Sequence, residues 1–228
     1  MRAAVDETRG DQRAIEVLFG PGLVRSLLAY IGGARQHERG GVLLGRRDER
    51  AVRIGAAVFP PQLAQARDHC AFDVTSIDVI RKAVTELPDR RTREMVGAIV
   101  GWVHSHPGHG LFLSRTDMVT LSAWAQLDER AIAVVVDPFL HGPPEERIAW
   151  WPAVGGRGRT AGTSGGEDDG MTVTMASAVA DQIADAPRAS YESWDLVTSY
   201  SIISVFPRPA APGGGGHRAT PKRREPRW

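Results

Sequence analysis

Two histidines, a serine and an aspartate whose side chains could form a metal site lie close together between residues 104 and 117. His104 and His106 are two residues apart, so in an extended segment their imidazoles point to the same side. Asp117 falls in the first turn of a predicted helix, where a strand end, a loop and a helix start can converge. Two imidazoles and one carboxylate are ligands that Zn²⁺ takes readily, and three protein ligands leave the fourth tetrahedral position free for water. The spacing therefore predicts one catalytic zinc ion, held by His104, His106 and Asp117.

Each of these residues also has an ordinary structural role that must be weighed. A His-Ser-His-Pro turn can be a surface loop, and an aspartate in the first turn of a helix favours the helix dipole. Ser114 can be only the N-cap of that helix. A second ligand set would replace Asp117 by His109, although a Pro-Gly turn separates His109 from the other two histidines. The combination of these four residues at fixed spacing favours the site with Asp117.

The full pattern is His-x-His, seven residues, serine, two residues and aspartate. It resembles the motif of the JAMM (MPN-plus) metalloproteases, which His104, His106, Ser114 and Asp117 match with no departure in spacing. The Gly-Trp before the motif and the Pro-Gly turn within it resemble the deubiquitinases of the proteasome lid and the signalosome in particular. The resemblance covers about residues 14 to 152, and it is strong at this motif and at one element upstream.

The upstream element begins at Glu38, an acidic residue that leads into a Gly-Gly and apolar strand. Hydrolysis by a metal-activated water needs a group that accepts a proton and later passes it to the departing amine. A carboxylate beside the metal that is not itself a ligand fits this work, and Glu38 is the candidate. Its alternative is a solvent-facing acid at a strand start. The resemblance implies that Ser114 is a second catalytic residue, which donates a hydrogen bond to the oxyanion of the tetrahedral intermediate.

The resemblance implies a zinc-dependent metallopeptidase that hydrolyses a peptide or isopeptide bond after the C-terminal glycine of a ubiquitin-like protein. A Gly-Gly tail suits a narrow groove, because it can lie extended and close to the backbone. Two alternatives stay open: an amidohydrolase acting on a sulfur-carrier adduct or a small amide, and a non-catalytic MPN module that scaffolds a complex. The complete ligand set favours an enzyme, and the preference for arginine over lysine is typical of a GC-rich bacterial chain.

Composition narrows the possible partners and the compartment. The formal net charge is +1 at pH 7, which gives no electrostatic case for nucleic acid or a membrane as partner. Cys70 is the only cysteine, which excludes an internal disulfide and a cysteine-based zinc cage, and as a nucleophile it lacks a recognisable sequence context. No apolar run has the length of a membrane span, and residues 1–13 lack the hydrophobic core of a signal peptide. We therefore expect a cytoplasmic protein.

Strands and helices interleave along the chain. Apolar runs predict strands at residues 14–19, 38–44, 51–59, 95–100, 131–136 and 146–151, and apolar residues at helical spacing predict helices that begin at residues 23, 73 and 114. Segments 60–70 and 89–94 are expected to be loops. This order predicts an α/β fold with a mixed sheet between helical layers. The resemblance implies the same, a three-layer α/β/α MPN sandwich similar to cytidine deaminases.

Composition, together with the resemblance for the catalytic domain, divides the chain into five expected segments. They are a disordered N-terminus (1–13), a JAMM/MPN catalytic domain (14–153), a flexible Gly/Ser/Asp-rich linker (154–170), a short extension of unknown role (171–206) and a disordered basic tail (207–228). The extension is expected to contain a short strand and a helix. A second strand follows them, which can dock on the main domain or on a protein partner.

Overall fold

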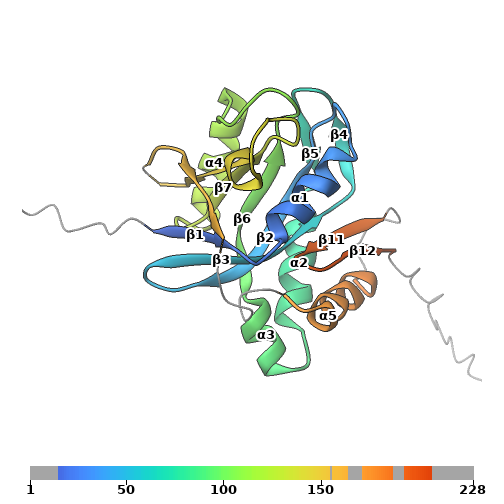
Figure 1. The fold of residues 1–228 in the computed structure, drawn as a ribbon. Coiled ribbons are helices and arrows are strands. Elements are labelled where there is room, and N and C mark those ends of the chain that lie inside the picture. The colour runs from blue at the N-terminus through green and yellow to red at the C-terminus, as the bar shows by residue number, and fades with distance from the viewer. Residues whose placement is uncertain (1–14, 155, 164–170, 187–192, 207–228) are drawn as a thin grey trace, which may run out of the picture.

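A mixed ten-stranded sheet forms the centre of the molecule, and helices cover both of its faces (Figure 1). The computed structural model describes residues 15–154, 156–163, 171–186 and 193–206. The strands are β1 (Glu16–Phe19), β2 (Gly40–Arg47), β3 (Ala51–Phe59), β4 (Gln62–Gln65), β5 (Cys70–Phe72), β6 (Ala98–Ser105), β7 (Ile132–Val136), β8 (Ile148–Pro152), β9 (Arg159–Thr160), β10 (Gly162–Thr163), β11 (Trp194–Thr198) and β12 (Ile202–Val205). The helices are α1 (Leu23–Gly32), α2 (Thr75–Thr85), α3 (Arg90–Val96), α4 (Arg115–Leu127) and α5 (Val173–Ala184), with a 3₁₀ turn at Pro144–Arg147.

The strand that carries the first histidine lies in the middle of the sheet. The strand order is β10-β1-β3-β2-β6-β7-β8-β9, while β11 pairs with β3 and β12 pairs with β11. The pairs β1–β10, β1–β3 and β6–β7 are parallel, and the other pairs of this sheet are antiparallel. Strand β6 is therefore hydrogen-bonded on both sides, to β2 and to β7, which holds its end in a fixed position.

Both faces of the sheet are buried under helices. Successive side chains of a strand point to opposite faces, and β2 illustrates the result. Val42 and Leu44 belong to the apolar cluster that includes residues of α2, α4 and α5, whereas Leu43 belongs to the cluster that includes α1. This confirms the predicted three-layer α/β/α architecture with a mixed sheet.

Two predicted loops contain regular structure. Residues 89–94 were expected to be a charged loop, but α3 begins at Arg90 because Asp89 caps it: the Asp89 carboxylate accepts the backbone N–H of Thr92 at 2.6 Å. Residues 60–70 were also expected to be a loop, and most of this segment belongs to the two-stranded hairpin β4–β5. Strands of three and four residues are too short to show a hydrophobic pattern in the sequence.

The strand expected at residues 95–100 lies further along the chain. Its first residues close α3, and β6 then runs from Ala98 to Ser105. His104 is therefore inside the strand and not beyond its end, while His106 follows it directly.

The segment expected to be a flexible linker is paired where the structure describes it. Within residues 156–163, β9 pairs with β8 and β10 pairs with β1, so that this short segment covers both edges of the sheet. Unpaired strand edges expose backbone donors and acceptors, and pairing satisfies them. Residues 164–170 of the predicted linker lie outside the described residues, as do the predicted disordered segments 1–13 and 207–228.

The extension packs on the main domain. Helix α5 lies against α2, and β11 pairs antiparallel with the second half of β3. Trp194 and Leu196 are 1% and 0% exposed, and they belong to the same apolar cluster as Val58 and Ile80. The sheet and the extension therefore share one hydrophobic core.

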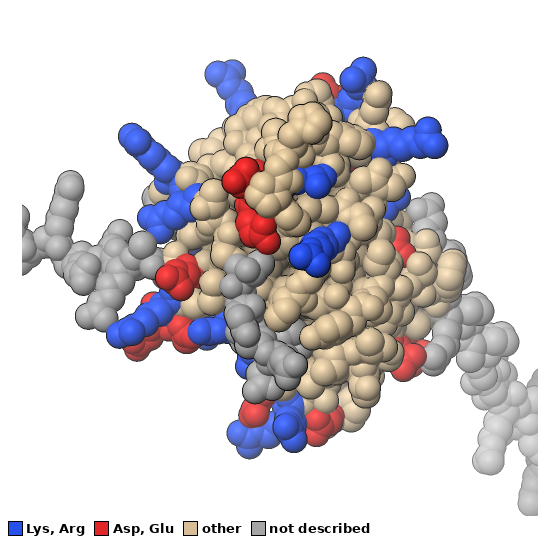
Figure 2. All heavy atoms as spheres, in the orientation of Figure 1, with Lys and Arg blue, Asp and Glu red and all other residues tan. Residues whose placement is uncertain are grey.

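Acidic and basic side chains are mixed on the face of the molecule shown in Figure 2. This distribution agrees with the formal net charge of +1. Across the described ranges, no helix combines the length and the apolar character needed to cross a membrane.

Candidate metal centre

Backbone pairing brings Glu38 beside the two histidines. Gly40, the first residue of β2, is the register partner of His104 in β6. Beyond this pair, Ser105 N–H donates to the Arg39 carbonyl oxygen at 3.0 Å, and the Ser105 hydroxyl oxygen accepts the Arg39 N–H at 2.9 Å. These two bonds extend the pairing past the strand ends, and they place Glu38, which precedes Arg39, next to His106, which follows Ser105.

The start of helix α4 delivers the aspartate. Ser114 is the N-cap, and its hydroxyl oxygen accepts the backbone N–H of Asp117 at 3.2 Å. In return, Asp117 Oδ2 accepts the backbone N–H of Ser114 at 2.7 Å, which completes a capping box. The same carboxylate faces both histidines. The helix cap therefore also orients Asp117 toward the two imidazoles.

The side chains of His104, His106 and Asp117 converge, and one ligand atom from each lies within 4.8 Å of the others. His104 Nε2 lies 3.0 Å from His106 Nε2 and 3.2 Å from Asp117 Oδ1, and His106 Nε2 lies 3.3 Å from Asp117 Oδ2. In a tetrahedral zinc site with bonds of about 2.1 Å, ligand atoms stand roughly 3.4 Å apart. The three side chains are largely buried, and among the described residues they form the one group of histidine, cysteine and acidic side chains with metal-ligand spacing. Their chemistry and spacing fit a single Zn²⁺ ion.

The ionisation of these groups suits ligation. Burial lowers the pKa of His104, which keeps its ring neutral. Burial by itself would raise the pKa of Asp117, but hydrogen bonds from His104 and His106 outweigh it and hold this pKa well below the usual range. Neutral imidazole and ionised carboxylate are the forms that bind a metal.

Aromatic packing orients the two imidazoles. The His104 ring stacks on Trp102, with centroids 4.4 Å apart and an interplanar angle of 10°, and the His106 ring lies 4.7 Å from the Phe112 ring. In the described part of the chain, the Nδ1 atoms of both histidines have no hydrogen-bond partner. Sequence reasoning assigned no orienting role to either aromatic residue. The spacing of Trp102 and His104, two apart on one strand, was the available signal for the first.

Glu38 lies next to the three ligands without joining them. Its Oε1 atom is 3.9 Å from His106 Nε2, and the side chain is 7% exposed. Burial raises the pKa of Glu38 to about 7, the proximity of His106 lowers it, and the Asp117 charge raises it. A cation held by the three ligands would favour the ionised carboxylate. The position suits a group that exchanges protons with a water molecule beside the metal.

The structure places His109, the alternative metal ligand, and Cys70, considered as a nucleophile, outside the group of three candidate ligands. The His109 ring is directed elsewhere: its Nε2 atom bonds to the Arg67 carbonyl oxygen at 3.2 Å in the β4–β5 connection. Cys70 is close to Glu38, and burial together with the negative charge of Glu38 raises the pKa of its thiol well above the usual range. Such a thiol is a poor nucleophile at neutral pH.

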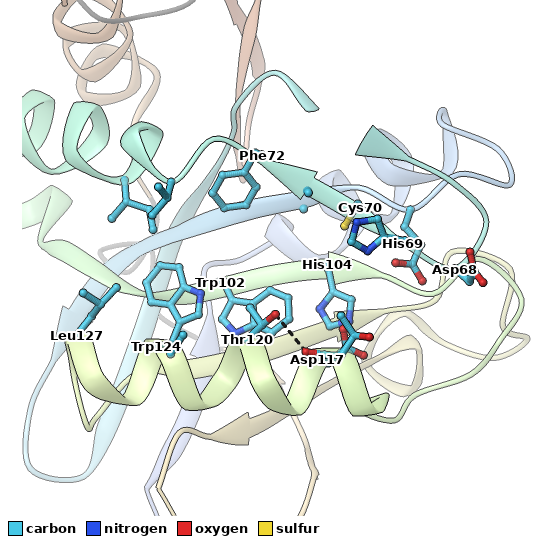
Figure 3. Close-up of a pocket in the computed structure, with 17 residues that line it drawn as sticks. Asp68, His69, Cys70, Phe72, Trp102, His104, Asp117, Thr120, Trp124 and Leu127 are labelled. Atoms are coloured by element: carbon cyan, nitrogen blue, oxygen red, sulfur yellow. Dashed lines mark hydrogen bonds and ion pairs between the residues drawn. The ribbon is translucent and has the colours of Figure 1, made fainter. Parts of the chain in front are cut away.

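A pocket of about 310 Å³ opens beside the site. Figure 3 shows His104 and Asp117 at one end, near Asp68 and His69, and Trp102, Trp124 and Leu127 toward the other. Strand β5 and the start of α2 form one wall, and α4 forms the opposite wall. The wall is mainly apolar away from the ligands. The sequence indicated that residues 60–70 could border a cleft, and their last three residues do line this one.

Comparison with known proteins agrees with this geometry. The profile of the family described as prokaryotic homologs of the JAB domain matches residues 21–153. The chain is 30% identical over 136 residues to the 26S proteasome regulatory subunit RPN11 of Candida glabrata, which covers 60% of this chain and 42% of that protein. It is 43% identical over 62 residues to the ubiquitin carboxyl-terminal hydrolase RPN11 of Saccharomyces cerevisiae, covering 27% of this chain and 20% of that protein.

A further relative is the 26S proteasome non-ATPase regulatory subunit 14 of Drosophila melanogaster, 58% identical over 41 residues, or 18% of this chain and 13% of that protein. The matches thus span less than half the length of each of these relatives. The family profile covers more than half of the 228 residues and includes Glu38, the two histidines, Ser114 and Asp117. The chain belongs to the JAMM/MPN family.

Proposed function

We propose that this protein is a zinc-dependent isopeptidase that cleaves after the C-terminal glycine of a ubiquitin-like protein. The observation that carries the proposal is the convergence of His104, His106 and Asp117 within 3.3 Å of one another, with Glu38 3.9 Å from His106. A site built only to stabilise the fold would not need a second buried carboxylate beside these three side chains.

The residues divide the chemistry between them. The His104 and His106 imidazoles and the Asp117 carboxylate would hold Zn²⁺, which lowers the pKa of a coordinated water to about 7 and polarises a carbonyl group. Glu38 accepts the proton of the attacking water and passes it to the departing amine. The Ser114 hydroxyl accepts one hydrogen bond as helix cap and keeps its own proton to donate to the oxyanion of the substrate.

The pocket and the relatives support the substrate class. A mainly apolar pocket lies beside the ligands between β5 and α4, and an extended tail without side chains at its last two residues can approach them closely. One relative carries the name ubiquitin carboxyl-terminal hydrolase. We infer that the substrate is a conjugate of a ubiquitin-like protein with a Gly-Gly terminus.

The test combines metal analysis with cleavage of a fusion protein that carries a ubiquitin-like C-terminus. We expect one zinc ion per chain and cleavage that a chelator abolishes and added zinc restores. Glu38→Gln keeps the shape and removes the proton acceptor, so it should retain zinc while kcat falls at least about 100-fold. Loss of zinc from this variant would make Glu38 a ligand instead.

Two outcomes contradict the proposal. Purified protein without zinc and without chelator-sensitive cleavage would leave a non-catalytic module. Cleavage of small amides but not of the fusion would leave an amidohydrolase with a different substrate.

A further inference from the structure

Asp137 is a buried carboxylate that holds the turn after His106. It follows β7 directly and is 1% exposed. Its Oδ1 atom accepts the backbone N–H groups of Gly108 and Phe139, each at 2.9 Å, and its Oδ2 atom accepts the N–H of Gly110 at 2.8 Å. No ion pair with Asp137 occurs among the described residues. Three backbone donors therefore compensate the burial of this carboxylate.

The turn has a conformation that serves this contact. Gly108 and Gly110 have φ values of 78° and 87°, in the left-handed region that glycine adopts without strain. A Cβ atom at either position would meet nothing within 4 Å, so lack of space does not explain the two glycines. The backbone conformation that turns both N–H groups toward Asp137 does explain them.

Backbone hydrogen bonds connect this turn to His106, the candidate metal ligand. The His106 N–H donates to the Val136 carbonyl oxygen at 2.9 Å, one residue before Asp137, and the His106 carbonyl oxygen accepts the N–H of His109 at 3.1 Å. A ligating histidine is usually oriented by a hydrogen bond from its second ring nitrogen. The Nδ1 atom of His106 has no such partner in the described residues, so the backbone and the Phe112 ring must set its orientation.

We propose that Asp137 is a positioning residue of the metal centre: its carboxylate fixes the turn after His106, and thereby the direction in which the His106 imidazole faces His104 and Asp117. This inference rests on the metal centre of the proposed function. It assigns to Asp137 no contact with the substrate or with the metal.

The test compares zinc affinity, measured by competition with a chromophoric chelator, in variants of the full chain. Asp137→Asn keeps the volume but turns an amide N–H₂ toward backbone N–H groups. We expect its zinc affinity to fall by about 10- to 100-fold, the usual effect of changing a residue that orients a ligand. The visible spectrum of the cobalt-substituted protein should change as well, because it reports the ligand geometry.

Two further variants separate positioning from loss of fold. Gly110→Ala introduces no collision and only disfavours the left-handed conformation, so it should weaken zinc binding in the same direction. If Asp137→Asn does not fold, Gly110→Ala becomes the test of the positioning role of Asp137. The control is Asp48→Asn: Asp48 accepts the backbone N–H groups of Arg50 and Ala51 in the turn between β2 and β3, away from the site, and its loss should leave zinc affinity unchanged.

The outcomes are distinct. This inference is overturned if folded Asp137→Asn keeps wild-type zinc affinity and an unchanged cobalt spectrum. If Asp137→Asn does not fold, the same result in Gly110→Ala overturns it. In both cases the proposed function stays intact. A wild-type protein that binds no zinc would overturn the metal centre itself, and with it this inference.

Discussion

At the scale of single residues, the proposed function gives the Ser114 hydroxyl a second role beside its role as helix cap, and a substitution separates the two. Removing an N-cap costs about 1 kcal/mol of stability, whereas removing an oxyanion donor costs roughly 3 kcal/mol of transition-state stabilisation. We expect Ser114→Ala to retain zinc, to lose a few degrees of melting temperature and to lower kcat about 100-fold or more. Steady-state kinetics and thermal unfolding measure the two effects.

The matched control for Ser114→Ala is a second hydroxyl cap. Thr172 begins α5 and accepts the backbone N–H of Met175 at 3.3 Å. Thr172→Ala should lower the melting temperature to a similar extent and leave kcat unchanged. A Ser114→Ala enzyme with unaltered kcat would show that this serine is a helix cap and nothing more.

Sequence spacing was sufficient to bring the three candidate ligands together, because each lies in a regular element or directly beside one. His104 and His106 share one side of an extended segment, and the capping box fixes Asp117 relative to Ser114. Spacing could not give the partners that come from elsewhere in the chain. The sequence carries no signal for the role of Asp137, because its three donors become neighbours only after the turn beyond β6 has folded.

At the scale of elements, the close approach of β6 and β7 depends on Gly101. A Cβ atom at this position would lie 2.0 Å from the Ile132 carbonyl oxygen, which belongs to the neighbouring strand. Because the obstacle is backbone, relief requires the two strands to separate. We expect Gly101→Ala to lower the free energy of unfolding by roughly 3 kcal/mol and to weaken zinc binding, since β6 carries His104. Denaturant titration and chelator competition provide the measurements.

Gly32→Ala is the control for that glycine substitution. Gly32 ends α1, and a Cβ atom there would have an ordinary contact of 3.6 Å with Pro138. Its replacement should leave stability unchanged or raise it by about 0.5 kcal/mol, because alanine favours the helix. Equal stability of Gly101→Ala and Gly32→Ala would contradict the inference that the close approach of β6 and β7 requires a glycine.

The sequence predicted elements with a strong apolar pattern and failed for those without one. The buried strands and α1, α2 and α4 followed from hydrophobic spacing. Helix α3 is a counterexample, because five of its seven residues are polar and Val96 is its one buried residue. Strands β9 and β10 are two residues each. Their pairing with β8 and β1, and not their own composition, makes them strands.

At the scale of the whole molecule, the extension and the main domain depend on one another. β11 pairs with the half of β3 that lies beyond β1, and its Leu196 is the register partner of Val58. Helix α5 buries five residues, of which Val179 and Ile183 are fully buried beside α2. Together with Trp194, these side chains complete the apolar cluster beneath the pocket. The boundary suggested by composition at residue 153 therefore crosses a continuous core.

This continuity gives a prediction for truncated chains. Full burial of one large apolar side chain contributes about 1.5–3 kcal/mol, so loss of Trp194, Leu196, Val179 and Ile183 together is comparable to the roughly 5–15 kcal/mol that stabilise a typical domain. A chain ending at Ala153 should therefore fail to show a cooperative thermal transition and should bind no zinc. A chain ending at Phe206 keeps every described contact and should match the full chain in both measurements. Cooperative unfolding and zinc binding by the shorter chain would instead make the extension a separate unit, attached to a core that is complete without it.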